Sequence, residues 1–156
     1  MDRISLEPIT RELCHRFYKG FENDPAIYMD MGTFKTYIYD VEKVDKYFES
    51  QISKDRVVFM IMRIEEPIGE VKLKYIDNIK KECSLGIHLQ NDVVKGLGIG
   101  TIAERMVLDY AFKELGMKKV YADAVQKNKR SQHVLEKVGF QFVNEDDMFK
   151  YYVIER

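Results

Sequence analysis

This sequence has few cysteines, few histidines and almost no net charge. Its two cysteines, Cys14 and Cys83, form neither a disulfide framework nor a metal-ligand spacing, so we expect reduced, buried thiols in a cytoplasmic protein. With three histidines in the whole chain, no metal site is predicted. The formal net charge of −1 indicates no phosphate-rich partner, so neither nucleic acid nor an anionic membrane is expected as a ligand.

Long apolar runs are absent as well. No stretch approaches the roughly 20 apolar residues of a membrane span, and residues 1–5 lack the hydrophobic segment of a signal peptide. Internal repeats and low-complexity segments are also missing. What remains is an ordinary globular composition, 46% hydrophobic and 33% charged, over 156 residues. We therefore predict one domain spanning residues 1–156.

The most informative stretch combines a strand, a glycine-rich loop and a helix. A strand-like run over 83–89 leads into alternating glycines, and apolar residues follow a helical spacing from Ile102 to Leu115. Backbone N–H groups and the positive end of a helix dipole then converge on one point, which predicts a phosphate site. Glycine suits such a loop because an anion can approach its backbone and because it adopts positive φ. A simple turn that joins strand to helix is the alternative.

The glycine spacing excludes two common phosphate loops. A Walker loop needs a lysine after its glycines, whereas Lys95 precedes them, and in a dinucleotide loop the third glycine would come one residue later. The stretch Lys95-Gly96-Leu97-Gly98-Ile99-Gly100 resembles instead the pyrophosphate loop of the GNAT superfamily of N-acetyltransferases, usually written Arg/Gln-x-x-Gly-x-Gly/Ala. Lysine stands where Arg or Gln is usual.

A second motif downstream strengthens this resemblance. Asn128 is followed three residues later by Ser131, and a Lys-Val-Gly-Phe ending closes the motif at Phe140, as in the other GNAT signature. The resemblance covers about 67–140 and is nearest to the branch that acetylates ribosomal-protein N-termini and related amines. It implies acetyl-CoA as cosubstrate and direct attack in a ternary complex by a primary amine, either a small molecule or a peptide N-terminus.

The pattern along the chain predicts an α/β fold, with a turn at 65–67 and a segment at 20–39 that is hard to assign. That segment is either a loop packed on the core or a lid facing the substrate, because Met and aromatic side chains make adaptable apolar walls. The family resemblance adds a mixed, mostly antiparallel sheet with a splayed parallel pair around the cofactor and helices on both faces. Strands are expected over 4–9, 57–62, 68–76, 83–89, 119–125, 140–144 and 148–155, and helices over 10–18, 40–52, 102–115 and 130–138.

The resemblance also implies which residues hold the cofactor. Ile87, His88 and Leu89 would offer backbone groups to the pantetheine arm, which would lie like an extra strand between the splayed pair. Asn128 and Ser131 would reach the arm and the sulfur, although Asn128 is equally suited to be only a helix cap. The pyrophosphate would lie on Lys95, Gly96, Leu97, Gly98, Ile99, Gly100 and Thr101.

Acetyl transfer also needs a proton donor for the leaving thiolate. Many family members carry it as a tyrosine four residues before the glycine of the second motif, where this chain has Leu135. Leucine cannot donate a proton. The hydroxyl of Ser131 and water are the alternatives, and the sequence does not choose between them.

A proton acceptor for the amine is expected on the central strands. The candidates are Glu82, His88, Glu70 and Asp123, of which Glu82 and His88 share one strand face by alternation. His88 has the ordinary pKa best suited to the task. The predicted catalytic residues are therefore Ser131, Glu82 and His88.

Two other functions fit parts of the sequence. The missing tyrosine favours a noncatalytic acyl-CoA-binding or acyl-CoA-sensing module on the same fold. Asp123, about 20 residues past the glycines, would suit a nucleotide-binding oxidoreductase, but the glycine spacing speaks against it. For an acetyltransferase, the acidic side chains of Glu22, Asp24 and Asp30 favour a cationic amine as acceptor. The expected protein partner is a second copy of the chain, in a homodimer.

Overall fold

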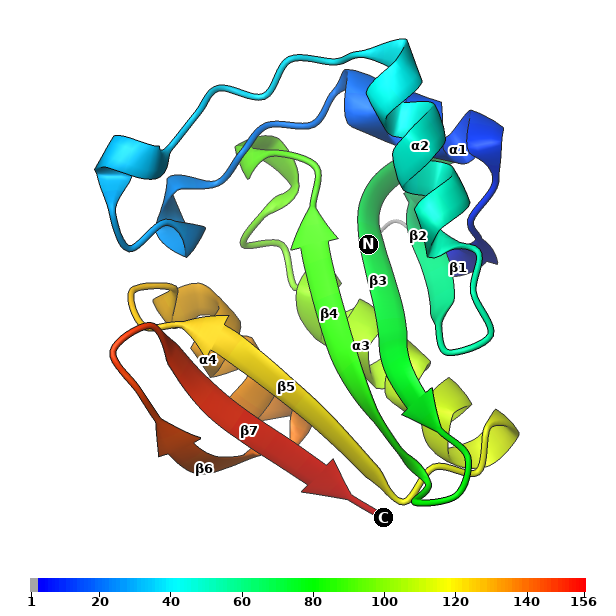
Figure 1. The fold of residues 1–156 in the computed structure, drawn as a ribbon, viewed down its shortest axis with the longest axis vertical. Helices are drawn as coiled ribbons and strands as arrows, with labels where there is room; N and C mark the ends of the chain where they lie inside the picture. The colour runs from blue at the N-terminus through cyan, green and yellow to red at the C-terminus, as the bar shows by residue number, and fades with distance from the viewer. Residues whose placement is uncertain (1–2) are drawn as a thin grey trace.

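The computed structural model describes residues 3–156 and shows one mixed sheet with helices on both faces (Figure 1). Its seven strands follow the order β1-β2-β3-β4-β5-β7-β6, with every neighbouring pair antiparallel except β4 and β5. The predicted α/β fold is confirmed. The strands are β1 (Ile4–Pro8), β2 (Val57–Arg63), β3 (Glu66–Asp77), β4 (Glu82–Leu89), β5 (Lys119–Val125), β6 (Gln141–Glu145) and β7 (Phe149–Glu155). The α-helices are α1 (Arg11–Lys19), α2 (Val41–Gln51), α3 (Ile99–Asp109) and α4 (Lys129–Val138).

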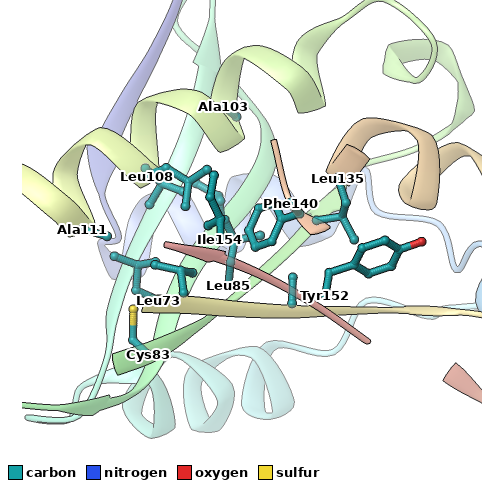
Figure 2. Close-up of a cluster of buried hydrophobic side chains, with 14 of the residues drawn as sticks. Leu73, Cys83, Leu85, Ala103, Leu108, Ala111, Leu135, Phe140, Tyr152 and Ile154 are labelled. Atoms are coloured by element: carbon teal, nitrogen blue, oxygen red, sulfur yellow. The ribbon is translucent and has the colours of Figure 1, made fainter. Parts of the chain in front are cut away.

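Two buried clusters hold the helices on the sheet. The α3–α4 face contains the larger cluster, which includes Leu85, Leu108 and Ile154 (Figure 2). The α1–α2 face contains the second cluster. Strand β2 serves both clusters because its side chains alternate: Met60 joins the second cluster and Ile61 the first. No helix in the described part of the chain is long and apolar enough to cross a bilayer.

The chain turns between β2 and β3 earlier than predicted. Ile64 and Glu65 have φ values of 50° and 62°, so they form a two-residue hairpin turn with left-handed backbone. Such a turn matches the right-handed twist of the strands. The predicted turn at 65–67 is therefore wrong, since β3 begins at Glu66. Pro67 lies inside β3 beside a register shift, where a strand tolerates proline.

α3 begins three residues earlier than predicted, at Ile99 instead of Ile102. Gly98 is its N-cap with a φ of 79°, and Gly96 has a φ of 74°. Gly100 already lies in the first turn of the helix. The left-handed conformation predicted for this loop is thus confirmed for two of its glycines, while the third continues the helix.

β4 and β5 form the parallel pair over a short stretch only. Glu82–Ser84 pair with Lys119–Tyr121, and beyond Ser84 the two strands diverge (Figure 1). Past that point β4 stays paired with β3 and β5 with β7. Each strand therefore turns one unpaired edge toward the gap between them. The splayed parallel pair implied by the family resemblance is confirmed.

Residues 20–39, called the arch below, cross above the splayed ends of β4 and β5 (Figure 1). They contain two short 3₁₀ turns, η1 (Pro25–Ile27) and η2 (Met31–Thr33), which are capped by Asp24 and Asp30. The backbone N–H of Glu22 donates to the carbonyl of Gln90 over 2.8 Å, which ties the arch to the end of β4. η1 also contacts β5. The arch therefore spans the two strands that diverge.

Candidate active site

A cleft of about 690 Å³, part of it open to solvent, lies where β4 and β5 diverge. Its walls come from the end of β4, the loop and first turns of α3, the start of α4, and the arch. Of the predicted cofactor residues, it brings together Ile87, His88, Leu89, Lys95, Gly100, Asn128 and Ser131.

The end of β4 offers the cleft a free strand edge. Ile87, His88 and Leu89 lie past the last residue paired with β5, and β3 binds them on the other side. An extended ligand with amide groups can add to such an edge as a further strand. The pantetheine arm carries amides along an extended chain, so these residues fit the arm of acetyl-CoA.

The turn before α3 leaves room for an anion. A Cβ atom built on Gly96 or Gly98 would meet no heavy atom within 4 Å. The α3 N-terminus has Gly98 as its cap and no side-chain cap hydrogen bond. Its first N–H groups and the positive end of its dipole are thus available to a phosphate, which fits the pyrophosphate of acetyl-CoA.

The remaining loop residues turn their side chains elsewhere. Ile99 and Thr101 are buried in the protein, and Leu97 is exposed at the surface. The cleft is not lined by these three side chains. Any contact that they make with an anion comes from the backbone.

Lys95 is already engaged by two carboxylates. Its Nζ lies 3.0 Å from Oδ2 of Asp24 in the arch and 3.2 Å from Oδ1 of Asp92. Burial alone would raise the pKa of Asp24, but hydrogen bonds from the Ala26 N–H and from Lys95 hold it below its usual value. The lysine therefore connects the arch to the glycine loop, and a phosphate would compete with Asp24 for its ammonium group.

The start of α4 forms the opposite wall. The side chain of Asn128 accepts a hydrogen bond from the Ser131 N–H over 3.2 Å, so Asn128 caps the helix while both residues line the cleft. Leu135, at the position where many family members carry tyrosine, is 2% exposed and packs in the core (Figure 2). It does not line the cleft. This wall therefore offers the Ser131 hydroxyl and no phenol at the motif position.

A buried carboxylate holds His88 through a phenol. The Tyr18 hydroxyl lies 3.2 Å from both Nε2 of His88 and Oε2 of Glu70, which faces His88 across β3 and β4. Glu70 is fully buried, accepts a second hydrogen bond from the Tyr47 hydroxyl, and lies 3.1 Å from Nζ of Lys72. Since Tyr18 donates its one proton to Glu70, its oxygen accepts from Nε2–H of His88. The lone pair of the imidazole is then on Nδ1.

Burial lowers the pKa of His88 below its ordinary value of 6.5. The charge of Glu70 opposes this shift, and the charges of Lys72 and Lys95 add to it. The imidazole is therefore neutral at neutral pH and able to accept a proton. Burial, followed by the charge of Glu70, raises the pKa of Tyr18, so the phenol between the two groups stays protonated.

Two predicted proton acceptors lie away from the cleft. Glu82 pairs with Lys119 at the start of β4, about 20 Å along the strand from His88. Asp123 is exposed on β5, on the face opposite the buried Ala122. Neither lines the cleft, so the structure brings His88 and Ser131 together but not Glu82.

Sequence reasoning missed two groups at this site. Tyr18 belongs to the apolar stripe of α1, and no local pattern indicates that it reaches β3 and β4. Glu104 lines the cleft from α3. The sequence could have indicated this position, because Glu104 falls four residues after Gly100 and four before Leu108, on the buried face of the helix.

Known proteins share this sequence pattern. Residues 3–141 match the model of the acetyltransferase (GNAT) domain family. The spermidine N(1)-acetyltransferase of Escherichia coli K12 is 23% identical over 144 residues, which cover 91% of this chain and 75% of that protein. The putative ribosomal N-acetyltransferase YdaF of Bacillus subtilis is 32% identical over 72 residues, or 46% of this chain and 39% of that protein.

Solved structures share the fold over nearly the whole chain. The spermidine N-acetyltransferase of Vibrio cholerae in complex with CoA and spermine has a TM-score of 0.78 at 19% identity, covering 97% of this chain and 95% of that one. Campylobacter jejuni N-acetyltransferase PseH has a TM-score of 0.74 at 19% identity, covering 98% of each chain. The chain therefore belongs to the GNAT family of N-acetyltransferases and transfers the acetyl group of acetyl-CoA to an amine.

Proposed function

We propose that the acceptor is a small cationic amine of the polyamine kind and that His88 takes the proton from its attacking nitrogen. The observation that carries this proposal is the neutral imidazole on the cleft wall, backed by Tyr18 and the buried Glu70. The names of two similar proteins support the choice of acceptor, because one is a spermidine acetyltransferase and another was solved with spermine.

The arch supplies both apolar and acidic residues to the part of the cleft that we assign to the amine acceptor. Phe21 and Ile27 line it with apolar surface, while Glu22 and Asp24 add carboxylates. Because Asp24 is paired with Lys95, Glu22 is the carboxylate assigned to a second ammonium group of the substrate. An apolar wall beside a carboxylate suits an alkyl chain that ends in an ammonium group.

Each part of the site then has a role in the reaction. Bound acetyl-CoA supplies an acetyl group activated as a thioester. The cradle at 96–98 holds the phosphates, and the β4 edge at 87–89 aligns the arm. His88 receives the amine proton on Nδ1, and Glu70 stabilises the resulting imidazolium through Tyr18.

A panel of acceptors tests the proposal. Thiol release from acetyl-CoA is measured with spermidine, spermine, putrescine, an aminoglycoside and peptides with free N-termini. We expect kcat/KM for the best polyamine to exceed that of the peptides roughly 10-fold or more, the range that pocket contacts achieve. Turnover restricted to peptides would overturn the choice of acceptor.

A matched pair of variants tests the proton acceptor. His88→Gln should lower kcat by about 10²-fold or more, as for loss of a positioned base. Glu82→Gln changes a polar side chain at the far end of the same strand, and its kcat should stay within about 3-fold of the wild type. Equal effects of the two variants would overturn the role of His88.

The homodimer and the cytoplasmic location stay predictions. One solved spermidine N-acetyltransferase from Vibrio cholerae is described as dodecameric, which supports assembly of copies in this fold. Both cysteines are buried free thiols, as predicted, and burial raises the pKa of Cys83 to about 11.

A further inference from the structure

Glu104 is a buried carboxyl group without a partner on the wall of the cleft. It lies on α3, is 2% exposed, and its Oε1 has no hydrogen-bond partner among residues 3–156. Gln132, a buried polar side chain on α4, is by contrast satisfied, since it donates to the carbonyls of Val125 and Gln126 over 3.0 and 2.8 Å. A buried polar group left unpaired destabilises a fold, so its retention in a cleft points to a ligand.

Glu104 lines the cleft farther along α3 than the phosphate cradle. It follows Gly100 by one helical turn, about 6 Å along the helix axis. The cradle lies at the N-terminus of α3, and the apolar residues Ile87, Leu89 and Val134 line the same cleft. A cofactor with its phosphates on the cradle and its arm along the β4 edge would share the cleft with this carboxyl group.

The carboxyl group holds a proton at neutral pH. Burial raises the pKa of Glu104 to about 8, and the structure gives it no ion pair within the described residues. The charged or titratable groups that share the cleft wall are His88 on β4, Lys95 before α3, Arg130 on α4, and Glu22 and Asp24 in the arch.

We propose that Glu104 donates the proton that the CoA sulfur receives when the thioester C–S bond breaks. It replaces the phenol that is absent at Leu135. The new C–N bond forms as the C–S electron pair passes to sulfur, which takes the Glu104 proton. Glu104 then regains a proton from solvent, while His88 returns the amine proton to solvent. The inference rests on acetyl transfer itself and not on the choice of amine.

Binding measurements test the contact without turnover. Calorimetry compares CoA with desulfo-CoA, which lacks the sulfur, on the wild type and on Glu104→Leu, a variant that fills the site with an apolar side chain. We expect the wild type to prefer CoA by about 2- to 10-fold, the worth of one hydrogen bond, and Glu104→Leu to bind both equally. An unchanged preference in Glu104→Leu would overturn the proposal.

Kinetics separate proton donation from binding. Glu104→Gln and Glu104→Leu should each lower kcat by about 10²-fold, with KM for acetyl-CoA within about 3-fold of the wild type. Wild-type activity should fall above about pH 8 as Glu104 loses its proton, and neither variant should show that limb. Ser131→Ala is measured alongside, because the Ser131 hydroxyl is the alternative proton donor.

Three kinetic outcomes would also overturn the proposal. One is an unchanged kcat in both Glu104 variants, and another is a raised KM with an intact kcat, the mark of a binding role alone. The third is an alkaline limb that persists in both Glu104 variants while kcat falls about 10²-fold in Ser131→Ala, which would assign the donor to Ser131. Circular dichroism confirms that each variant is folded before it is scored.

Discussion

The two buried carboxyl groups beside the cleft differ in their partners. Glu70, on the α1–α2 face of the sheet, is met by Tyr18, Tyr47 and Lys72. The Oε1 of Glu104, on the α3 side, meets no donor in the described chain. Residue type and burial are the same, so the surroundings decide the chemistry. A carboxylate among donors can stabilise an imidazolium, whereas an isolated carboxyl keeps its proton and becomes a donor.

Replacing Glu70, the carboxylate that has partners, should have the largest effect on stability. Glu70→Leu leaves the Lys72 ammonium and two phenols without their acceptor in a mostly buried site. We expect the free energy of unfolding to fall by about 3–5 kcal/mol, as when one partner of a buried ion pair is lost. Urea denaturation measures it, with Glu66→Leu as the control because Glu66 forms an exposed pair with Arg16. Similar losses in both variants would contradict the account.

The pH dependence of the free energy of unfolding should show that Glu104, unlike Glu70, has no partner for its charged form. The folded-state pKa of Glu104, about 8, lies above the ordinary 4.5, so between these values the folded protein binds more protons than the unfolded chain. The stability from this group is full below about pH 4.5 and is lost as the pH rises through about 8, at up to about 1.4 kcal/mol per pH unit.

Glu104→Gln cannot titrate, so it should remove that slope. Urea unfolding of wild type and variant from pH 5 to pH 9 gives the difference in the free energy of unfolding. The variant should gain stability relative to the wild type as the pH rises, because only the wild type must take up a proton at this position when it folds. A difference that does not vary with pH would show that Glu104 is not held neutral.

Substituting two glycines should distinguish the loss of cofactor binding from the cost of backbone strain. These substitutions should have the smallest effect on stability. Gly98 and Gly116 have φ values of 79° and 69°, and a Cβ on either would meet no atom within 4 Å. Valine at either position should destabilise the fold by about 1–2 kcal/mol through strain. Only Gly98→Val should also weaken CoA binding, by about 10-fold or more, measured by calorimetry. Equal CoA affinities of the two variants would mean that the loop is only a turn.

The order of elements and the cofactor loop could be predicted because local patterns decide them. Each of these features depends on residues that are close in sequence: the alternation in the strands, the cap at Asn128 and the glycines at 96–100. The start of α3 could not be placed, because Gly100 adopts the helical conformation as readily as the left-handed one. Local sequence also gave no means of choosing Ile64–Glu65 over 65–67 for the hairpin turn.

The chemistry of the site depends on contacts between distant segments. Tyr18 meets Glu70 across 52 residues and His88 across 70, so no window of sequence reveals the chain that orients the imidazole. Local sequence also does not show that Glu82 lies away from the cleft that His88 lines. The two share a strand face, but only the structure shows that the cleft opens at one end of β4.

The most direct test of the account is the pH profile of kcat for acetyl-CoA with spermidine in wild type, His88→Gln and Glu104→Gln. A proton acceptor on one face of the cleft and a donor on the other predict a bell-shaped wild-type profile. His88→Gln should lose the acidic limb and Glu104→Gln the alkaline limb, each with a lower maximum. Two variants that keep both limbs of the wild-type profile would contradict the assignment of donor and acceptor.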